Sequence, residues 1–355
     1  MQHLHTVEAR IVVTAFYSPR RVTSSSPIPS LPGERRWTVY GLVLTTPHRF
    51  ANHVVRTSAP ADLWVRPVEA APIAPGWQDL APAYRSDLMI DDDQHFLDVI
   101  VAPNATVFHF SEVVDFFVLE DGIACHVHDA AYDFMVELHL LGYVLSYWLE
   151  RAGHLALHAS GVVVDDHVIG FLGERGAGKT SLAATMIARG YSLATDDLLG
   201  LTPTPGGYLA SPGYPQMRMW PEQARHFFGH DRFERVKRAN PKLRVPVGRG
   251  SFGAFDGAVR PLAALYAPQR HDGDEVTFQN LPAGPAMFHL ARTSYLVGIV
   301  EGAGLAVRRF AILGDLVARV PVRVVRYPNG LDRLPEIAER IADNARSLVR
   351  GSSTW

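Results

Sequence analysis

The sequence contains a single cysteine, Cys125, among its 355 residues. One cysteine excludes a disulfide within the chain and any metal site made from several cysteines, and it fits a protein kept in a reducing cytosol. The chain also lacks an excess of positive charge, with 34 Lys and Arg against 36 Asp and Glu. Because binding to nucleic acid depends on a basic surface, we expect no nucleic-acid partner.

Long hydrophobic runs are also missing. The most apolar stretch, residues 134–149, contains Glu137 and His139 and is too short to cross a bilayer. The sequence does not open with a basic segment followed by an apolar core, so we expect no signal peptide. These absences predict a soluble, cytoplasmic protein with no membrane partner.

The composition is that of a globular protein, with 47% apolar and 20% charged residues, and a chain of this length suggests two domains. Residues 1–128 combine recurring prolines with short strand-like runs at 10–16, 39–44 and 107–110. Strands broken by proline turns are typical of a β-rich domain with irregular loops. We therefore expect such a domain over residues 1–128.

Residues 129–355 show a different pattern, which predicts an α/β domain. The region opens with an amphipathic helix expected over 130–151, and strands and helices follow. Two strands, expected over 155–164 and 167–172, are separated by a two-residue turn, so they should form a hairpin within a mixed sheet. The stretch 202–253 is rich in Gly, Pro and Arg, and we interpret it as long loops around one helix.

A glycine-rich loop is the most informative feature of the chain. It consists of Gly173, Glu174, Arg175, Gly176, Ala177, Gly178, Lys179 and Thr180. The loop matches the phosphate-binding pattern G-x-x-x-x-G-K-[ST], and it lies between a predicted strand and a helix that is expected to begin at Ser181. Backbone N–H groups of such a loop and the helix N-terminus favour an anion. Lys179 should reach the β and γ phosphates of a nucleotide, and the Thr180 hydroxyl should bind Mg²⁺.

Two consecutive aspartates, Asp196 and Asp197, supply the carboxylates that a magnesium–nucleotide site needs. They begin seventeen residues beyond Lys179, after a strand expected over 191–195. One carboxylate can hold the metal while the other accepts a proton from an attacking hydroxyl. Aspartate is also common as a cap at a loop or helix start, but the phosphate loop favours a functional pair.

A histidine, His158, lies shortly before the glycine loop, in the strand expected over 155–164. The three residues after it are Ala, Ser and Gly, which are small and leave room for a ligand. On the residues alone, a single histidine in a strand is interpreted first as a hydrogen-bonded structural residue.

Three segments together resemble the catalytic domain of the bacterial HPr kinase/phosphorylase family. They are residues 157–162 (LHASGV), the glycine loop 173–180, and residues 189–197 (RGYSLATDD). The resemblance in order and spacing covers about residues 155 to 200. It implies a fold like that of the phosphoenolpyruvate-carboxykinase-type P-loop kinases, with ATP and Mg²⁺ as cofactors. It also implies that Asp197 accepts the serine proton with His158 beside it, and that Asp196 lies on the metal side.

The segment after the aspartates departs from that family. The family signature LE-[IV]-RG-x-G is absent, and SPGYPQMRMW stands at 211–220. In this respect the chain resembles diverged HPr-kinase-like proteins encoded with ribosomal peptide clusters, including lasso-peptide precursor serine kinases. Arg218 is a candidate phosphate or metal-side contact in place of the signature. Lys242 and Arg244 belong to a basic run that is a candidate phosphate-closing loop, although such a run is also typical of a solvated surface.

The leading hypothesis is an ATP- and Mg²⁺-dependent kinase that phosphorylates a hydroxyl, with a serine of a lasso-type precursor peptide or of a protein as the favoured acceptor. The N-terminal domain would present that acceptor. Two alternatives stay open: a kinase of a small hydroxyl compound such as free serine or a sugar, and a regulatory nucleotide-binding module without transfer. The sequence leaves open the acceptor, the nucleotide preference, a phosphorylase back-reaction and the oligomeric state, a homo-oligomer included.

A weaker pattern is the segment Cys125-His126-Val127-His128, which places two histidines on one face of a strand. Two ligands are too few for a stable metal site, and no third ligand lies near them in the sequence. We therefore expect no metal site at this segment.

Overall fold

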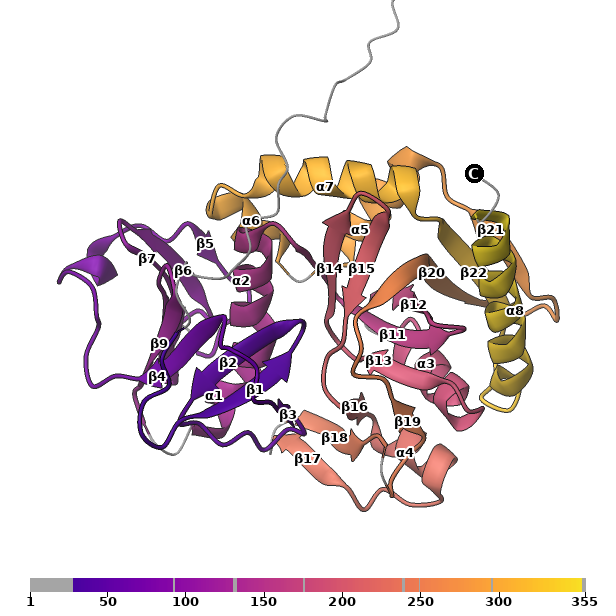
Figure 1. The fold of residues 1–355 in the computed structure, drawn as a ribbon, viewed down its shortest axis with the longest axis horizontal. Coiled ribbons are helices and arrows are strands. Elements are labelled where there is room, and N and C mark those ends of the chain that lie inside the picture. The colour runs from indigo at the N-terminus through magenta and orange to yellow at the C-terminus, as the bar shows by residue number, and fades with distance from the viewer. Residues whose placement is uncertain are drawn as a thin grey trace, which may run out of the picture.

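The computed structural model of the chain describes residues 28–91, 93–129, 133–174, 176–237, 240–248, 250–294 and 296–352 (Figure 1). The strand expected over residues 10–16 lies outside these residues. The described chain is a mixed α/β structure with two large sheets and one small sheet. The two large sheets lie side by side in Figure 1. Within the described residues, every helix is too short or too polar to span a lipid bilayer.

The N-terminal part of the described chain folds into a nine-stranded sheet, with the order β3-β1-β2-β4-β9-β8-β7-β6-β5. Its strands are β1 (Arg35–Val39), β2 (Leu42–Thr46), β3 (Val55–Arg56), β4 (Leu63–Pro67), β5 (Tyr84–Arg85), β6 (Asp98–Ala102), β7 (Ala105–Phe110), β8 (Val114–Val118) and β9 (Gly122–Val127). Strand β4 is parallel to β2 and β9, and the other pairs are antiparallel. The strand predicted over 107–110 is part of β7.

The run 39–44, which we predicted as one strand, contains a turn between two strands. Strand β1 ends at Val39 and β2 begins at Leu42. The turn residues Tyr40 and Gly41 have φ angles of 54° and 79°. A two-residue turn with positive φ at both positions matches the twist of antiparallel strands. The sequence hid this turn because Val39, Tyr40 and Leu42 are all apolar and buried.

A helical segment covers one face of the N-terminal sheet. It comprises α1 (Asp133–His139), a π-helical turn η3 (Leu140–Val144) and α2 (Leu145–Ala152), and it ends at Gly153, whose φ is 90°. The helix predicted over 130–151 is thus confirmed from residue 133 onward. Leu141, Leu145 and Trp148 lie in one buried cluster with Phe108 and Phe116 of the sheet. Their spacing along the helix is what makes this face apolar.

The second large sheet has the order β10-β14-β15-β20-β12-β11-β13-β19, and β22 and β21 extend it beside β20. Its strands are β10 (Leu155–Leu157), β11 (Ala159–Val164), β12 (His167–Leu172), β13 (Ser192–Thr195), β14 (Leu199–Thr204), β15 (Gly207–Ser211), β19 (Ala254–Phe255), β20 (Arg260–His271), β21 (Thr277–Asn280) and β22 (Val322–Pro328). Strand β11 is antiparallel to β12, and β12 is parallel to β20. The predicted hairpin and mixed sheet are therefore confirmed.

Helices cover both faces of this second sheet. On one face, α3 (Lys179–Ala188) and α8 (Leu334–Ser352) share an apolar cluster with Ile169 and Phe171 of β12. On the other face, α5 (Ala283–Arg292) and α7 (Ala306–Arg319) share a cluster with Val168 and Leu172. Alternate residues of a strand point to opposite faces, which is why β12 is apolar from Val168 to Leu172. A short helix, α6 (Val297–Gly302), joins the cluster of the N-terminal sheet instead.

Residues 202–253 contain several strands where we predicted long loops. Besides β14 and β15, the region forms a small sheet of order β16-β18-β17 with α4 (Pro221–Phe228) beside it. These strands are β16 (Gln216–Met219), β17 (Glu234–Lys237) and β18 (Asn240–Pro246). They are short and carry Arg, Lys or Pro, so their hydrophobic pattern is weak. Met217, Met219 and Val245 nevertheless pack in the same cluster as α3.

A buried ion pair joins the two parts of the chain. Arg309 of α7 contacts Glu150 of α2, and both side chains are almost fully buried. Glu150 also accepts a hydrogen bond from the backbone N–H of Ala156 at 2.9 Å, and Arg309 donates one to Ser294 Oγ at 2.6 Å. Burial raises the pKa of Glu150, and the charge of Arg309 opposes this rise. A buried charge without its partner lowers the free energy of unfolding, so the pair stabilises the fold only while both residues are present.

We predict that Arg309→Leu lowers the free energy of unfolding by about 3–5 kcal/mol, because it leaves Glu150 buried without its cation. The double variant Glu150→Gln, Arg309→Leu should lose less free energy of unfolding, since neither buried side chain of the pair is then charged. Urea denaturation followed by circular dichroism measures both losses, with Arg340→Leu, at an exposed position of helix α8, as the control. Equal stability of the single variant and the wild type would contradict the prediction.

Candidate active site

The three sequence motifs lie at one edge of the second sheet. Strand β11 is antiparallel to both β12 and β13, so β12 and β13 run parallel and end at the same edge. The glycine loop follows β12, the two aspartates follow β13, and His158 precedes β11. Because neighbouring strands are about 4.8 Å apart, the loop and the aspartates begin about 10 Å from each other. The predicted residues are thus brought together by the order of three strands.

The glycine loop has the strand–loop–helix context that was predicted from the sequence. The described loop residues include three glycines with positive φ, namely Gly173 at 145°, Gly176 at 87° and Gly178 at 95°. A Cβ at Gly178 would lie 2.6 Å from the hydroxyl oxygen of Tyr327, so a larger residue does not fit there. Arg175, which we predicted to contact the nucleotide, lies outside the described residues. Ala177 donates its backbone N–H to the carbonyl of Glu174 at 3.1 Å.

Lys179 folds back across the loop that precedes it. Its Nζ donates hydrogen bonds to the carbonyl oxygens of Gly173, at 2.6 Å, and Glu174, at 3.2 Å. Burial lowers the pKa of Lys179, and the charges of Asp197 and Asp196 oppose this shift. The ammonium group therefore lies against the loop carbonyls, where the charges of the two aspartates act on it. A phosphate in the loop would offer it stronger, charged acceptors than the two carbonyls.

Two hydroxyl residues begin helix α3 directly after Lys179. Ser181 Oγ accepts a hydrogen bond from Gln223 Nε2 at 2.7 Å, which ties the helix start to α4. Thr180 is half-buried at the same helix start. Glu174, another predicted contact, forms an exposed ion pair with Arg292 of α5. Thr180 thus lies in the first turn of α3, next to the loop and at the positive end of the helix dipole.

The two aspartates differ in their surroundings. Asp196 is buried and accepts hydrogen bonds from Ser160 Oγ at 2.7 Å and from the backbone N–H of Arg218 at 2.9 Å. Asp197 has a φ of 68°, and its carboxylate pairs with the guanidinium of Arg218 at 2.9 Å. A non-glycine residue in the left-handed region is uncommon, and aspartate is one of the residues that adopt it most readily.

The same surroundings shift the two pKa values in opposite directions. Burial, and next the negative charge of Asp197, raises the pKa of Asp196. Burial alone would also raise the pKa of Asp197, but Arg218, followed by Lys242 and other nearby cations, holds it below its usual value. Asp197 is therefore the carboxylate that stays ionised most readily.

His158 lies at a break in the strand that we predicted over 155–164. Strand β10 ends at Leu157 and pairs with β14, whereas β11 begins at Ala159 and pairs with β12 and β13. His158 Nδ1 lies 3.0 Å from the backbone carbonyl of Asp197. Burial lowers the pKa of His158, which favours the neutral ring. A neutral ring that donates from Nδ1 keeps Nε2 as an acceptor and fixes the backbone of Asp197.

The three basic residues that we predicted as phosphate contacts come from the small sheet. Arg218 of β16 lies opposite Arg244 of β18 in the antiparallel register. Arg218 reaches the aspartates, whereas Arg244 pairs with Glu234 of β17 at 3.3 Å. Lys242 Nζ lies over the ring of Trp220, 5.9 Å from its centroid. The basic run is therefore a strand rather than a loop, because Lys242 and Arg244 both belong to β18.

Several residues near the site were not predicted as site residues, because no motif in the sequence marks them. Ser160 follows His158 by two residues and reaches Asp196, and Tyr214 accepts a hydrogen bond from Arg218 at 3.3 Å. Arg270 of β20 donates to the carbonyl of Gly176 at 2.8 Å. Arg270 also lines a surface cavity of about 400 Å³ together with Gln269, His271, Glu275, Thr277 and Arg326. Arg270 is far from the glycine loop in the sequence, and the parallel pairing of β12 with β20 brings it beside Gly176.

The N-terminal sheet borders the site through β16. Gln216 Nε2 donates to Asn52 Oδ1 at 2.6 Å, and the buried carboxylate of Glu137 accepts hydrogen bonds from the backbone N–H groups of Ala51 and Asn52. The backbone N–H of Tyr40 donates to the carbonyl of Pro212 at 2.8 Å. The β1–β2 turn and the loop after β2 therefore hold the segment that leads to Arg218.

Comparison with known proteins gives a limited result. No protein-family model matches the chain, and no curated protein matches it. Among solved structures, the HPr(Ser) kinase/phosphatase from Coxiella burnetii is similar at 15% sequence identity and a TM-score of 0.29. The match covers 55% of this chain and 98% of that one. These values are too low to assign a fold family or a function to this chain.

We predict that Arg218→Gln raises the pKa of Asp197, because it removes the largest charge that opposes burial of this carboxylate. NMR titration of protein carrying ¹³C-labelled aspartate measures the shift, and Asp197→Asn assigns the signal. Arg225→Gln, which breaks an exposed ion pair with Asp231, is the matched control. An Asp197 signal that titrates at the wild-type pH in Arg218→Gln would contradict the prediction.

Proposed function

We propose that the chain is an ATP- and Mg²⁺-dependent phosphotransferase that transfers the γ-phosphoryl group to a hydroxyl. The observation that carries this proposal is the pair of unequal carboxylates at the sheet edge beside a glycine loop with a lysine. Asp196 is buried and hydrogen-bonded, whereas Asp197 is kept ionised by Arg218. Phosphoryl transfer needs mainly positioned charges of this kind around the phosphates and the nucleophile.

The donor set fits a magnesium–nucleotide complex. Magnesium prefers hard oxygen ligands, which the Thr180 hydroxyl and the Asp196 carboxylate supply. Each oxygen of Asp196 accepts one hydrogen bond and keeps a further lone pair for a ligand. A bound Mg²⁺ would neutralise charge on the phosphates. Lys179 and the backbone N–H groups of the loop would hold the β and γ phosphates.

Asp197 is the group that we propose as proton acceptor. Its low pKa keeps it ionised at neutral pH, and the His158 ring holds its backbone at the sheet edge. Arg218 would move between Asp197 and the transferring phosphate, since a guanidinium binds both kinds of anion. Lys242 and Arg244 would add positive charge from the neighbouring strand. The order of β11, β12 and β13 around the site supports a phosphoenolpyruvate-carboxykinase-type P-loop kinase fold.

For the acceptor, we propose a serine of a ribosomal precursor peptide. The N-terminal sheet contacts β16 through Asn52 and Gln216, so a peptide held by this sheet would lie near Arg218 and Asp197. The resemblance of the segment 211–220 to precursor-peptide kinases favours the same acceptor. A small hydroxyl compound is the second candidate acceptor. A regulatory module that only binds the nucleotide is the alternative function. A cytoplasmic location and a homo-oligomeric state remain expectations.

We predict that Asp197→Asn lowers the rate of phosphoryl transfer by about 10²–10⁴-fold, because the amide cannot accept the proton. The affinity for ATP should change little, since Asp197 does not hold the phosphates. Single-turnover transfer from labelled ATP and calorimetric ATP binding measure the two quantities. Asp332→Asn, at an exposed position, is the control. A variant that keeps full transfer would contradict the role of Asp197, and wild-type protein that binds ATP without any transfer would favour the regulatory module.

The acceptor is tested by offering labelled ATP with candidate precursor peptides, free serine and simple sugars. We expect label on a peptide serine and none on the same peptide after Ser→Ala substitution. Mass spectrometry locates the phosphate. Label on the small compounds alone would overturn the peptide assignment while leaving phosphotransfer intact.

A further inference from the structure

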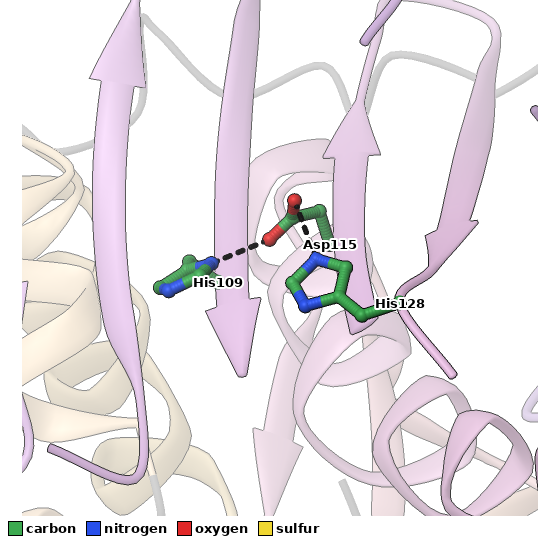
Figure 2. A group of neighbouring side chains, drawn as sticks. All are labelled: His109, Asp115 and His128. Atoms are coloured by element: carbon green, nitrogen blue, oxygen red, sulfur yellow. Dashed lines mark hydrogen bonds and ion pairs between the residues drawn. The ribbon is translucent and has the colours of Figure 1, made fainter. Parts of the chain in front are cut away.

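A cluster of two histidines and one aspartate lies on the N-terminal sheet, outside the phosphotransfer site. His109 of β7 and Asp115 of β8 are directly opposite each other in the antiparallel register. His128 follows β9, the strand on the other side of β8. Figure 2 shows both imidazole rings turned toward the carboxylate of Asp115 between them. Three neighbouring segments of the sheet thus present three metal-ligand side chains at one point.

The distances define a compact set of donor atoms. His109 Nδ1 lies 2.6 Å from one carboxylate oxygen of Asp115, and His128 Nε2 lies 2.9 Å from the other. All three ligand atoms fall within 4.8 Å of one another. Asp115 is 5% exposed, whereas the two histidine side chains are 33% and 25% exposed. The carboxylate is therefore fixed in the sheet, and the imidazoles form the side that an ion could reach.

This geometry needs only a small change to bind a cation. Two donor atoms about 2.1 Å from one ion at the tetrahedral angle lie about 3.4 Å apart. Each nitrogen–oxygen distance would therefore open by less than about 1 Å. The ion would take the place of the protons that now join the rings to the carboxylate. Two imidazoles and one carboxylate suit zinc and related first-row metals rather than Mg²⁺ or Ca²⁺, which prefer oxygen ligands.

The surroundings hold the ligands in place. The ring of Trp77 packs edge-on against His109 and Phe117, with centroids 6.2 Å and 5.5 Å apart. The hydrogen bond to Asp115 raises the pKa of His109 although burial opposes this. His126, opposite Asp115 in the register, donates a hydrogen bond from Nδ1 to the carbonyl oxygen of Val68, 3.1 Å away. Oriented ligands with packed neighbours are typical of metal sites.

The sequence pattern could not reveal this group, because its members are far apart in the chain. We expected no metal at Cys125-His126-Val127-His128 because a third ligand was missing nearby. Of that segment only His128 belongs to the cluster, and its partners Asp115 of β8 and His109 of β7 lie thirteen and nineteen residues earlier in the chain. Cys125 belongs to the apolar cluster on the opposite face of the sheet, so its sulfur is not part of this group.

We propose that His109, Asp115 and His128 bind one divalent transition-metal ion of the zinc class. Three protein ligands leave at least one coordination position open to water or to an anionic group. This site is separate from the magnesium site proposed at Thr180 and Asp196.

The test uses the full chain without a polyhistidine tag. Co²⁺ is titrated into the metal-stripped protein, and the visible d–d absorption reports binding and coordination; Zn²⁺ should then displace it. We expect one equivalent per chain. Asp115→Asn and His128→Gln should each weaken binding by at least about tenfold, because each removes a ligand. His53→Gln, an exposed histidine in the same part of the chain, should bind as the wild type does.

Folding is checked separately by the thermal midpoint of each variant without metal. His128→Gln serves as the decisive variant, since its position after the end of β9 is partly exposed and a glutamine should be tolerated there. Absence of stoichiometric Co²⁺ and Zn²⁺ binding by the wild type would overturn the proposal. Undiminished binding by a folded His128→Gln variant would overturn it as well, because the ion would then lie elsewhere.

Discussion

The contact of Arg218 with the two aspartates is the interaction on which the candidate site depends. Two adjacent carboxylates in a buried place repel each other, and burial alone favours their neutral forms. The Arg218 side chain offsets the charge of Asp197, and its backbone N–H donates to Asp196. One residue of β16 therefore separates the two carboxylates into a pair with different pKa values. In the phosphotransfer that we propose, this difference would let Asp196 hold the cation and Asp197 accept the proton.

The position of Arg218 depends in turn on the N-terminal sheet. The loop after β2 holds Gln216 through Asn52, and Glu137 of α1 holds that loop. The β1–β2 turn adds a backbone hydrogen bond to Pro212. The part of the chain that we propose to present the acceptor is thus also the part that supports the charged residues. If this part binds the acceptor as we propose, acceptor binding and the geometry of the site would be coupled through these contacts.

Residue type and periodicity predicted the elements that depend on neighbouring residues in the sequence. The glycine loop, the strand before it, the helix after it and the helix over 133–151 follow from residue type and periodicity, and the structure has them. The break at His158 and the turn at Tyr40 did not follow, because both lie within runs of apolar residues where period alone gives no signal. The strands within 202–253 were missed because they are short and carry arginine, lysine and proline. Contacts such as Ser160 with Asp196, or His109 with His128, arise only when distant strands pair.

A structure of the chain with Mg²⁺ and a non-hydrolysable ATP analogue tests the central claim most directly. We expect the β and γ phosphates at the backbone N–H groups of residues 173–180, with Lys179 turned from the loop carbonyls to the phosphates. The metal should contact Thr180 and Asp196, and Asp197 should face the γ-phosphate without binding the metal. A nucleotide bound elsewhere, or a metal held without Asp196, would contradict the account.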